Sequence, residues 1–363
     1  MTTLGTAAPG RVQGFHPGWY GAVMGTAVVG IVAAQNPGAV PAVADTAHAL
    51  GVVAVGLAVA LAVVLGVPYV ARWVRYPADA RADFANPVVG GLYGTFPGGL
   101  IVLALGIAAV GPSVVSGDVV TAAVAALGIS GTLLAFIVSI AFTAQLVLRP
   151  SVEAPAINGS WFIPPVVTIV VPVVLVALAP HVAPSDLGGL IALAVAFWGM
   201  GIVLFVLVAS LFYDRLILHP PLPAPLAPSI WIGIGPAGVG SLALLRIAAA
   251  GTPLWGDAAP AVAAASLIGA TALWGLGLWW LGAASVILVA HRRRGPLPFG
   301  IGWWGFTFPL GAFAAATVGI ARGWHAAWLE ALGVVLFVAL LLTWAAVAAR
   351  TVRAVRAGSM WAR

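Results

Sequence analysis

The sequence predicts an all-α integral membrane protein with ten transmembrane helices, paired as five helical hairpins. Composition supplies the first two observations: apolar residues make up 62% of the 363 residues, and charged residues only 7%. An ordinary soluble domain is about 25% charged, so this chain has too few charges to cover a globular surface. The third observation is a series of ten apolar runs, most of them at least as long as the roughly 20 residues that cross a bilayer.

The ten runs are bounded by polar or turn residues, and each is expected to be one transmembrane helix. We expect them to form one channel or transporter domain over residues 15–355, flanked by tails over residues 1–14 and 356–363. Because the connections are short, consecutive helices should be antiparallel neighbours, which gives the five hairpins. In order, the runs cover residues 15–34, 47–70, 88–110, 119–148, 161–178, 187–218, 226–250, 259–290, 298–321 and 326–355.

The placement of arginine predicts the orientation. All 15 basic residues are arginines, and only Arg246 and Arg322 fall on one side of the ten-segment topology. The positive-inside rule assigns the other side to the cytoplasm. Both tails should then be cytoplasmic in a multi-pass protein of the plasma membrane, which requires an even number of helices. The remaining arginines are Arg11, Arg72, Arg75, Arg81, Arg149, Arg215, Arg292, Arg293, Arg294, Arg350, Arg353, Arg356 and Arg363.

The odd-numbered helices carry a helix-breaking residue near mid-length, and the even-numbered helices do not. A proline inside a helix leaves one backbone carbonyl without its hydrogen bond. An unsatisfied carbonyl costs several kcal/mol in lipid, so broken helices belong where protein or water can satisfy them. We predict that the odd helices line a central pore and that the even helices lie outside. The breaking residues are Gly25, Pro97, Pro172, Pro236 and Pro309.

The few ionisable residues disfavour several classes of function. None of the nine acidic residues falls at a predicted bilayer centre, which argues against a carboxylate proton relay or cation site. The chain has no cysteine and none of the motifs of a hydrolase or nucleotide-binding enzyme. We therefore expect no catalytic residue, no cofactor and no metal site. The arginines form no continuous basic face, so we expect no nucleic-acid partner.

Three stretches of the odd helices carry a resemblance to a known family: residues 17–26 (PGWYGAVMGT), 232–240 (IGIGPAGVG) and 303–311 (WWGFTFPLG). They resemble the tellurite-resistance/dicarboxylate transporter family. It includes TehA-type bacterial channels, the slow-type anion channels of plant guard cells, fungal malate permeases and fungal sulfite efflux pumps. The third stretch is the most specific, and the resemblance covers nearly the whole chain because the ten-helix layout also agrees.

This resemblance implies a homotrimer with one pore in each subunit, formed by five quasi-repeated hairpins with the odd helices around the pore. It also implies a gate, because a phenylalanine of the ninth helix closes the pore in well-studied members. The residue that matches it is Phe308, directly before Pro309. Phe96 is a second gate candidate because it repeats the Phe-Pro sequence, although packing is its preferred interpretation.

An apolar pore can carry anions if freed backbone groups, partial helix dipoles and hydroxyls face it. The candidate hydroxyls belong to Thr26, Thr95, Thr168 and Thr307, although a threonine in a helix more often bonds back to its own backbone. Arg246, inside the seventh segment, is interpreted first as a residue that reaches to the membrane interface. Its second interpretation is an anion ligand.

The leading hypothesis is transport of small anions through a pore in each subunit, gated by a phenylalanine, as a channel or uniporter-like permease of the lipid bilayer. The alternative is a proton-coupled carrier of C4-dicarboxylates such as malate, or an efflux pump for sulfite or tellurite-related oxyanions. A proton-coupled carrier needs a titrating group, for which the sequence offers only His16 or protonation of a substrate paired with arginine. The preferred interpretation of His16 is a residue at the membrane interface. A membrane enzyme or a structural scaffold is a third hypothesis, disfavoured by the absence of catalytic clusters.

Overall fold

The computed structural model of the chain describes residues 10–360. Over this range the regular secondary structure is entirely helical, and ten helical stretches are long and apolar enough to cross a membrane. The predicted fold class is therefore confirmed. The expected tails, 1–14 and 356–363, lie partly outside the described residues, and their position relative to the membrane stays a prediction.

Five spans form an inner set, and each begins with a 3-10 helix that continues into an α-helix. The α-helices are α1 (Gly21–Ala34), α4 (Thr95–Val110), α6 (Ile163–Ala177), α8 (Ile234–Ala250) and α11 (Thr307–Trp324). The 3-10 helices before them are η1 (Pro17–Tyr20), η3 (Gly90–Gly94), η6 (Gly159–Phe162), η8 (Ala227–Gly233) and η10 (Ile301–Phe306). These spans are the odd-numbered helices expected from the sequence.

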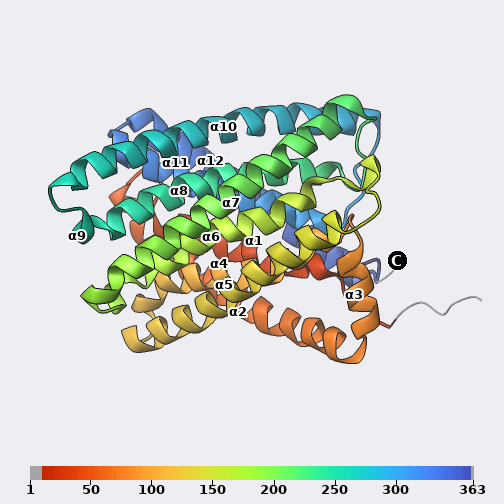
Figure 1. Ribbon diagram of the computed structural model, residues 1–363, viewed down its shortest axis with the longest axis horizontal. Coiled ribbons are helices and arrows are strands. Elements are labelled where there is room, and N and C mark those ends of the chain that lie inside the picture. Colours follow the sequence, from red (N-terminus) through yellow and green to blue (C-terminus); the bar gives the residue numbers. More distant parts are fainter. Residues whose placement is uncertain (1–9, 361–363) are drawn as a thin grey trace, which may run out of the picture.

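Five longer helices form an outer set: α2 (Ala44–Arg75), α5 (Gly117–Val147), α7 (Pro184–Leu218), α10 (Ala259–Arg294) and α12 (Ala327–Arg356). A surface helix, α3 (Pro77–Ala85), follows α2, and a single turn, α9 (Thr252–Trp255), precedes α10. Figure 1 shows α3 at one end of the molecule and α9 at the other. Short 3-10 turns at Pro41–Val43, Gly111–Ser113, Ala154–Ala156, Ala179–His181 and Gly256–Ala258 complete the connections.

Burial separates the two sets. In the most apolar part of each inner span, 67–83% of the residues are buried inside the protein, against 22–33% in the outer spans. The exposed large side chains of the outer helices are mostly Val, Leu and Ile. Lipid tails are as apolar as these side chains, so the exposed faces cost nothing in a bilayer. The even helices therefore form the lipid-facing layer, as the sequence predicts.

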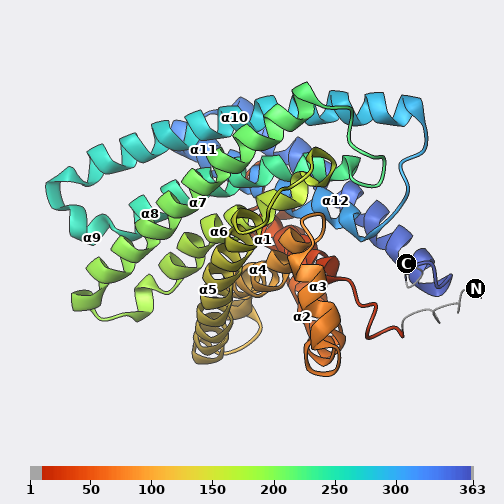
Figure 2. The same cartoon turned by 45° about the vertical axis from the view of Figure 1, so that its right-hand side comes forward.

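The inner helices close into a ring. In order, α1, α4, α6, α8 and α11 each pack against the next, and α11 packs against α1. Each outer helix packs on the inner helix of its own hairpin, which puts α2 on α1, α5 on α4, α7 on α6, α10 on α8 and α12 on α11. Each outer helix also contacts the inner helix of a neighbouring hairpin. In Figures 1 and 2, α10 and α2 lie at opposite borders of the bundle, with α1 between them.

The proline pattern holds with one correction. Pro97, Pro236 and Pro309 each occupy the third residue of their α-helix, directly after the change from 3-10 to α geometry. The residue at the same position of α6 is Pro165, whereas the predicted Pro172 lies seven residues (172 − 165) further on, about 10 Å along the helix. This segment contains three prolines, and their spacing alone does not show which one begins the α-helix.

The break in each inner span is therefore the junction between two helix types. A proline at the third α-helical position costs no intrahelical hydrogen bond, because the first four N–H groups of a helix have no partner within it. The first inner span has the same junction without a proline, between Tyr20 and Gly21. Its predicted breaking residue, Gly25, lies in the second turn of α1 and has a different role, described below.

Candidate functional site

Two cavities lie within the inner ring, one toward each end, and residues of all five inner spans line both. The first is lined by the 3-10 helices and the early turns of the α-helices and has a volume of about 180 Å³. The second is lined by the later turns and has a volume of about 790 Å³. We call the end where the inner spans begin the arginine-rich end, since Arg72, Arg75, Arg215 and residues 292–294 lie there.

Phe308 lies between the two cavities. Among the described residues it is the one that lines both of them, and its exposed fraction is 6%. It is the second residue of α11, directly after the helix junction. Its surroundings are apolar, with Met24 and Val166 in the lining on one side and Val28 and Ala312 in the lining on the other. Phe308 therefore lies where the linings of the two cavities meet.

Three inner helices line the larger cavity with residues at the same helical positions, as an internal repeat predicts. These are the eighth, eleventh, fourteenth and fifteenth positions, counted from the first residue of the α-helix. Positions three and four apart lie on one helix face, so the three helices present equivalent faces to the cavity. These residues are Val28, Ile31, Ala34 and Gln35 for α1, Val102, Leu105, Ala108 and Ala109 for α4, and Val170, Val173, Val176 and Ala177 for α6.

The lining of the smaller cavity contains five polar residues. Several of them link neighbouring 3-10 helices around the mouth: Asn158 Nδ2 donates to the carbonyl of Val88 at 3.1 Å, and the Ser229 hydroxyl accepts from the N–H of Gly159 at 2.9 Å. These bonds hold the starts of consecutive inner spans together. The polar lining residues are His16, Thr95, Asn158, Ser160 and Ser229.

The four predicted hydroxyls all bond to backbone carbonyls, and their role in transport stays a prediction. Thr95 lines the smaller cavity, and its hydroxyl lies 2.7 Å from the carbonyl of Leu92 and 2.9 Å from that of Pro17. The other three are fully buried, line neither cavity and donate within their own span: Thr26 to the carbonyl of Ala22 (2.7 Å), Thr168 to that of Pro164 (2.9 Å) and Thr307 to that of Trp304 (2.8 Å). A threonine in a helix readily makes this bond, which leaves its hydroxyl no proton to donate to a ligand.

Phe96 points away from the cavities. Its ring stacks on Tyr69 of α2, with centroids 4.4 Å apart and an interplanar angle of 4°, and meets Tyr20 edge to face at 4.6 Å. It lines neither cavity. These contacts favour packing for Phe96, which is also its preferred interpretation from the sequence.

Only one of the five predicted breaking residues reaches a cavity. Pro309 lines the smaller cavity beside Phe308. Pro97, Pro172 and Pro236 are buried in contacts between helices and line neither cavity. Gly25 lies where α1 approaches α11, because a Cβ atom placed on it would come 2.0 Å from Thr307 Oγ1. Pro97, Pro236 and Pro309 thus mark the start of their α-helices, and apart from Pro309 the cavities are lined by residues other than the predicted helix breakers.

Comparison with known proteins identifies the family. A family model described as voltage-dependent anion channel (SLAC1) matches residues 14–352. The chain belongs to this family. It is 28% identical to an uncharacterized transporter of Methanocaldococcus jannaschii over 96% of both chains. It is 29% identical to a sulfite efflux pump of Trichophyton rubrum over 94% of this chain and 91% of that protein. The resemblance carried by the three sequence stretches is thereby confirmed.

Family membership supports anion transport in general, in a multi-pass membrane protein. The relatives are transporters or channels, and none of those described is named as an enzyme. Within residues 10–360, no group of three or more His, Cys, Asp or Glu is placed to hold a metal ion. The two cavities of the ring are therefore the candidate site of this family member.

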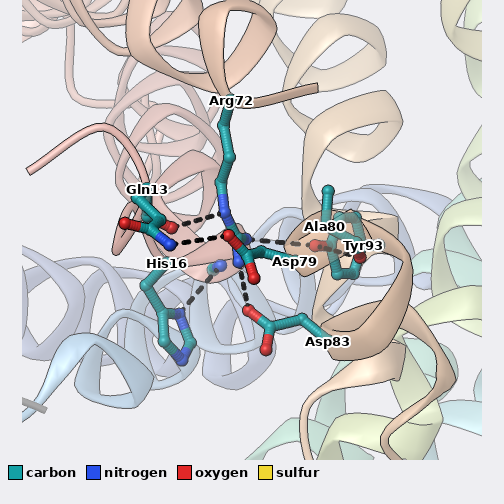
Figure 3. A network of polar contacts seen from close by, with 8 residues as sticks. Gln13, His16, Arg72, Asp79, Ala80, Asp83 and Tyr93 are labelled. Carbon is teal, nitrogen blue, oxygen red and sulfur yellow. Dashed lines mark hydrogen bonds and ion pairs between the residues drawn. The ribbon is translucent and has the colours of Figure 1, made fainter. Parts of the chain in front are cut away.

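A buried arginine holds the entry of the chain at the arginine-rich end (Figure 3). The side chain of Arg72 is 3% exposed, and its Nη2 pairs with Asp83 at 2.5 Å. Its Nε donates to the carbonyl of Gln13 at 2.9 Å, and its Nη1 donates to the Tyr93 hydroxyl at 3.1 Å. Three residues after Gln13, His16 lines the smaller cavity. The network thus attaches the segment that enters the ring to α2, α3 and η3.

Sequence reasoning missed the polar mouth of the smaller cavity. Asn158, Ser160 and Ser229 stand just before or within the 3-10 helices, outside the helix centres where pore residues were sought. A local signal existed for one of them: Asn158 is a preferred N-cap residue, and its Oδ1 accepts from the N–H of Ser160 at 2.9 Å. The sequence placed Arg246 correctly within the seventh segment, and the structure adds that it lines the larger cavity.

Proposed function

We propose that each subunit conducts small anions along the axis of the inner ring and that Phe308 gates this path. The observation that carries the proposal is the position of Phe308 between the two cavities, with an exposed fraction of 6%. An apolar ring at a constriction excludes water, and an anion that enters must lose its hydration. The path is therefore closed to anions while the ring stays in place.

The electrostatics of the path favour anions over cations. No Asp or Glu occurs among the described residues that line the two cavities, whereas Arg246 does. All five inner α-helices begin at the arginine-rich end, so the positive ends of their dipoles point toward the smaller cavity. The arginines around that end raise the local concentration of anions.

We propose passive, channel-like passage in preference to proton-coupled transport. A proton relay through the membrane requires ionisable groups along the path, and the lining offers His16 at one mouth and Arg246 at the other. The alternative, a proton-coupled carrier of C4-dicarboxylates such as malate, would depend on His16 alone. Export of sulfite is the second candidate function, favoured by the relatives named as sulfite efflux pumps.

Flux into proteoliposomes tests this function. Sulfite, nitrate, chloride and malate would be compared at equal ionic strength, with and without an imposed pH gradient, and with protein-free liposomes as the control. We expect each transported anion to follow its own electrochemical gradient whether or not a pH gradient is present. Accumulation of malate or sulfite against its gradient, driven by the pH difference, would show a carrier instead.

We further propose that the arginine-rich end and both termini face the cytoplasm of a plasma membrane. This orientation follows from the 13 arginines that the sequence topology assigns to one side of the membrane and from the positive-inside rule. The family resemblance also implies a homotrimer with one path per subunit. Light scattering of the detergent-solubilised protein checks the trimer by its protein mass.

A further inference from the structure

We propose that Arg246 forms an oxyanion-binding site in the larger cavity, at the mouth opposite the arginine-rich end. The inference rests on the proposed anion path and deepens it, because it names a residue that holds the ion as it enters or leaves. The ligand class is a small oxyanion such as sulfite, nitrate or a carboxylate.

Arg246 lies on the face of α8 that lines the larger cavity. The spacing along that face is three, four, three and one residues, which keeps the lining residues on one side of a helix. The side chain of Arg246 therefore leaves the backbone toward the interior of the ring, not toward the outer helices. The lining residues of α8 are Val239, Leu242, Arg246, Ala249 and Ala250.

The two arginines of this end differ in what they bind. Arg322 is committed to the protein: its Nε pairs with Glu330 at 2.9 Å, and its Nη2 donates to the carbonyl of Gln35 at 2.7 Å. Arg246 is exposed, and within residues 10–360 it makes no ion pair or hydrogen bond with the protein. Arg322 thus links α11 to α1 and α12, whereas the five N–H donors of Arg246 remain available to a ligand.

The walls of the cavity favour an ion pair at Arg246. Among the residues that the structure describes, no other ionised side chain lines the cavity, and the remaining polar lining side chains are Gln35 and Thr252. Because Arg246 is exposed to solvent, which screens the attraction in part, the lack of a competing charge in these walls is what favours an anion there. Asp186 and Asp257 lie in the chain near this mouth but outside the lining, so no carboxylate of the lining competes for the guanidinium.

The guanidinium of Arg246 favours oxyanions over halides. A guanidinium presents parallel N–H donors that bind two oxygens of one anion, which a spherical halide cannot match. Gln35 lies in the same lining, and its Oε1 is buried without a hydrogen-bond partner. We therefore expect sulfite and nitrate to bind more tightly than chloride.

Thermal unfolding of the purified full-length protein, titrated with sodium sulfite, sodium nitrate or sodium chloride at matched ionic strength, tests the site. We expect sulfite and nitrate to raise the Tm at lower concentrations than chloride. Arg246→Gln should raise the half-saturating concentration of both oxyanions about tenfold, the usual scale for a lost charge-assisted hydrogen bond. Arg246→Lys should lose less affinity for oxyanions, since lysine keeps the positive charge but not the planar donor geometry that binds two oxygens at once.

Arg322→Gln is the matched control. This substitution removes the ion pair with Glu330 at the same end of the molecule, so it should lower the Tm measured without added anion. The rise in Tm with oxyanion concentration should be unchanged. Oxyanion titrations that are the same for Arg246→Gln and the unsubstituted protein would overturn the site, as would equal responses to chloride and nitrate or no response at all. This measurement of binding does not depend on flux. If oxyanions bind through Arg246 but no anion is conducted, the proposed anion path is contradicted and the binding site still stands.

Discussion

Phe308→Ala is expected to raise anion conductance in planar bilayers on the order of tenfold, because it removes the apolar ring that divides the path. The helix junction at Pro309 stays intact, so the two cavities should merge without a change of fold. Space lies on both sides of the ring, so it has fewer packing contacts to lose than a core side chain. The loss of stability should therefore be less than the roughly 3–5 kcal/mol that truncation of a packed phenylalanine costs.

Phe313→Ala and Phe96→Ala are the controls for this experiment. Phe313 lies on the same helix, is fully buried and stacks on Trp274 with centroids 5.6 Å apart. Phe96 shares the Phe-Pro sequence and packs against α2 through Tyr69. Both variants should lose stability without gaining conductance. If Phe308→Ala instead behaves like Phe313→Ala, with a large fall in Tm and unchanged conductance, Phe308 is a packing residue.

Gly25→Ala is expected to destabilise the protein by about 3 kcal/mol, the upper end of the usual cost of overpacking, measured as a fall in Tm, because it overpacks the contact between α1 and α11. The added Cβ would meet Thr307 Oγ1 at 2.0 Å and Thr307 Cβ at 2.9 Å. Thr307 is fully buried and bonded to the carbonyl of Trp304, so it has little freedom to move aside. The helices themselves would have to separate.

Glycines of the outer helices provide the control for Gly25. A Cβ on Gly56 of α2 or Gly199 of α7 meets nothing within 4 Å. Alanine at either position should leave the Tm unchanged or raise it, since glycine costs a helix up to about 1 kcal/mol relative to alanine. Adding Thr307→Ala to Gly25→Ala removes the nearest atom and should recover part of the loss. A Gly25→Ala protein of normal Tm with reduced anion flux would restore Gly25 as a pore-lining residue.

The division into inner and outer helices could be predicted because lipid imposes a simple rule on sequence. A helix that faces lipid needs only apolar side chains, whereas helix junctions and prolines collect where protein surrounds them. Pro97, Pro236 and Pro309 therefore mark inner spans even without a structure. The depth of each break was less predictable, because α6 contains Pro164, Pro165 and Pro172, and only helix geometry distinguishes them.

The direction of a side chain was the part that local sequence could not supply. Phe96 and Phe308 are both the second residue of an inner α-helix, and both precede a proline. Phe96 nevertheless turns outward, because Tyr20 and Tyr69 offer it an aromatic cluster, while Phe308 stays between the cavities. Contacts distant in the chain decide between the two outcomes. Only the family resemblance singled out Phe308 in advance.

Cysteine labelling across Phe308 tests most directly whether the two cavities are halves of one path. The chain contains no cysteine, so Ala312→Cys places one reactive thiol in the larger cavity. Ser185→Cys, in the exposed first turn of α7 at that end, reports which membrane face a small anionic methanethiosulfonate reaches in sealed vesicles. Ala314→Cys, fully buried and outside both linings, should react from neither face.

We predict that Ala312→Cys reacts only from the face that labels Ser185→Cys, and from both faces once Phe308→Ala is added. Labelling from both faces with Phe308 in place, or from one face after its removal, would contradict the account.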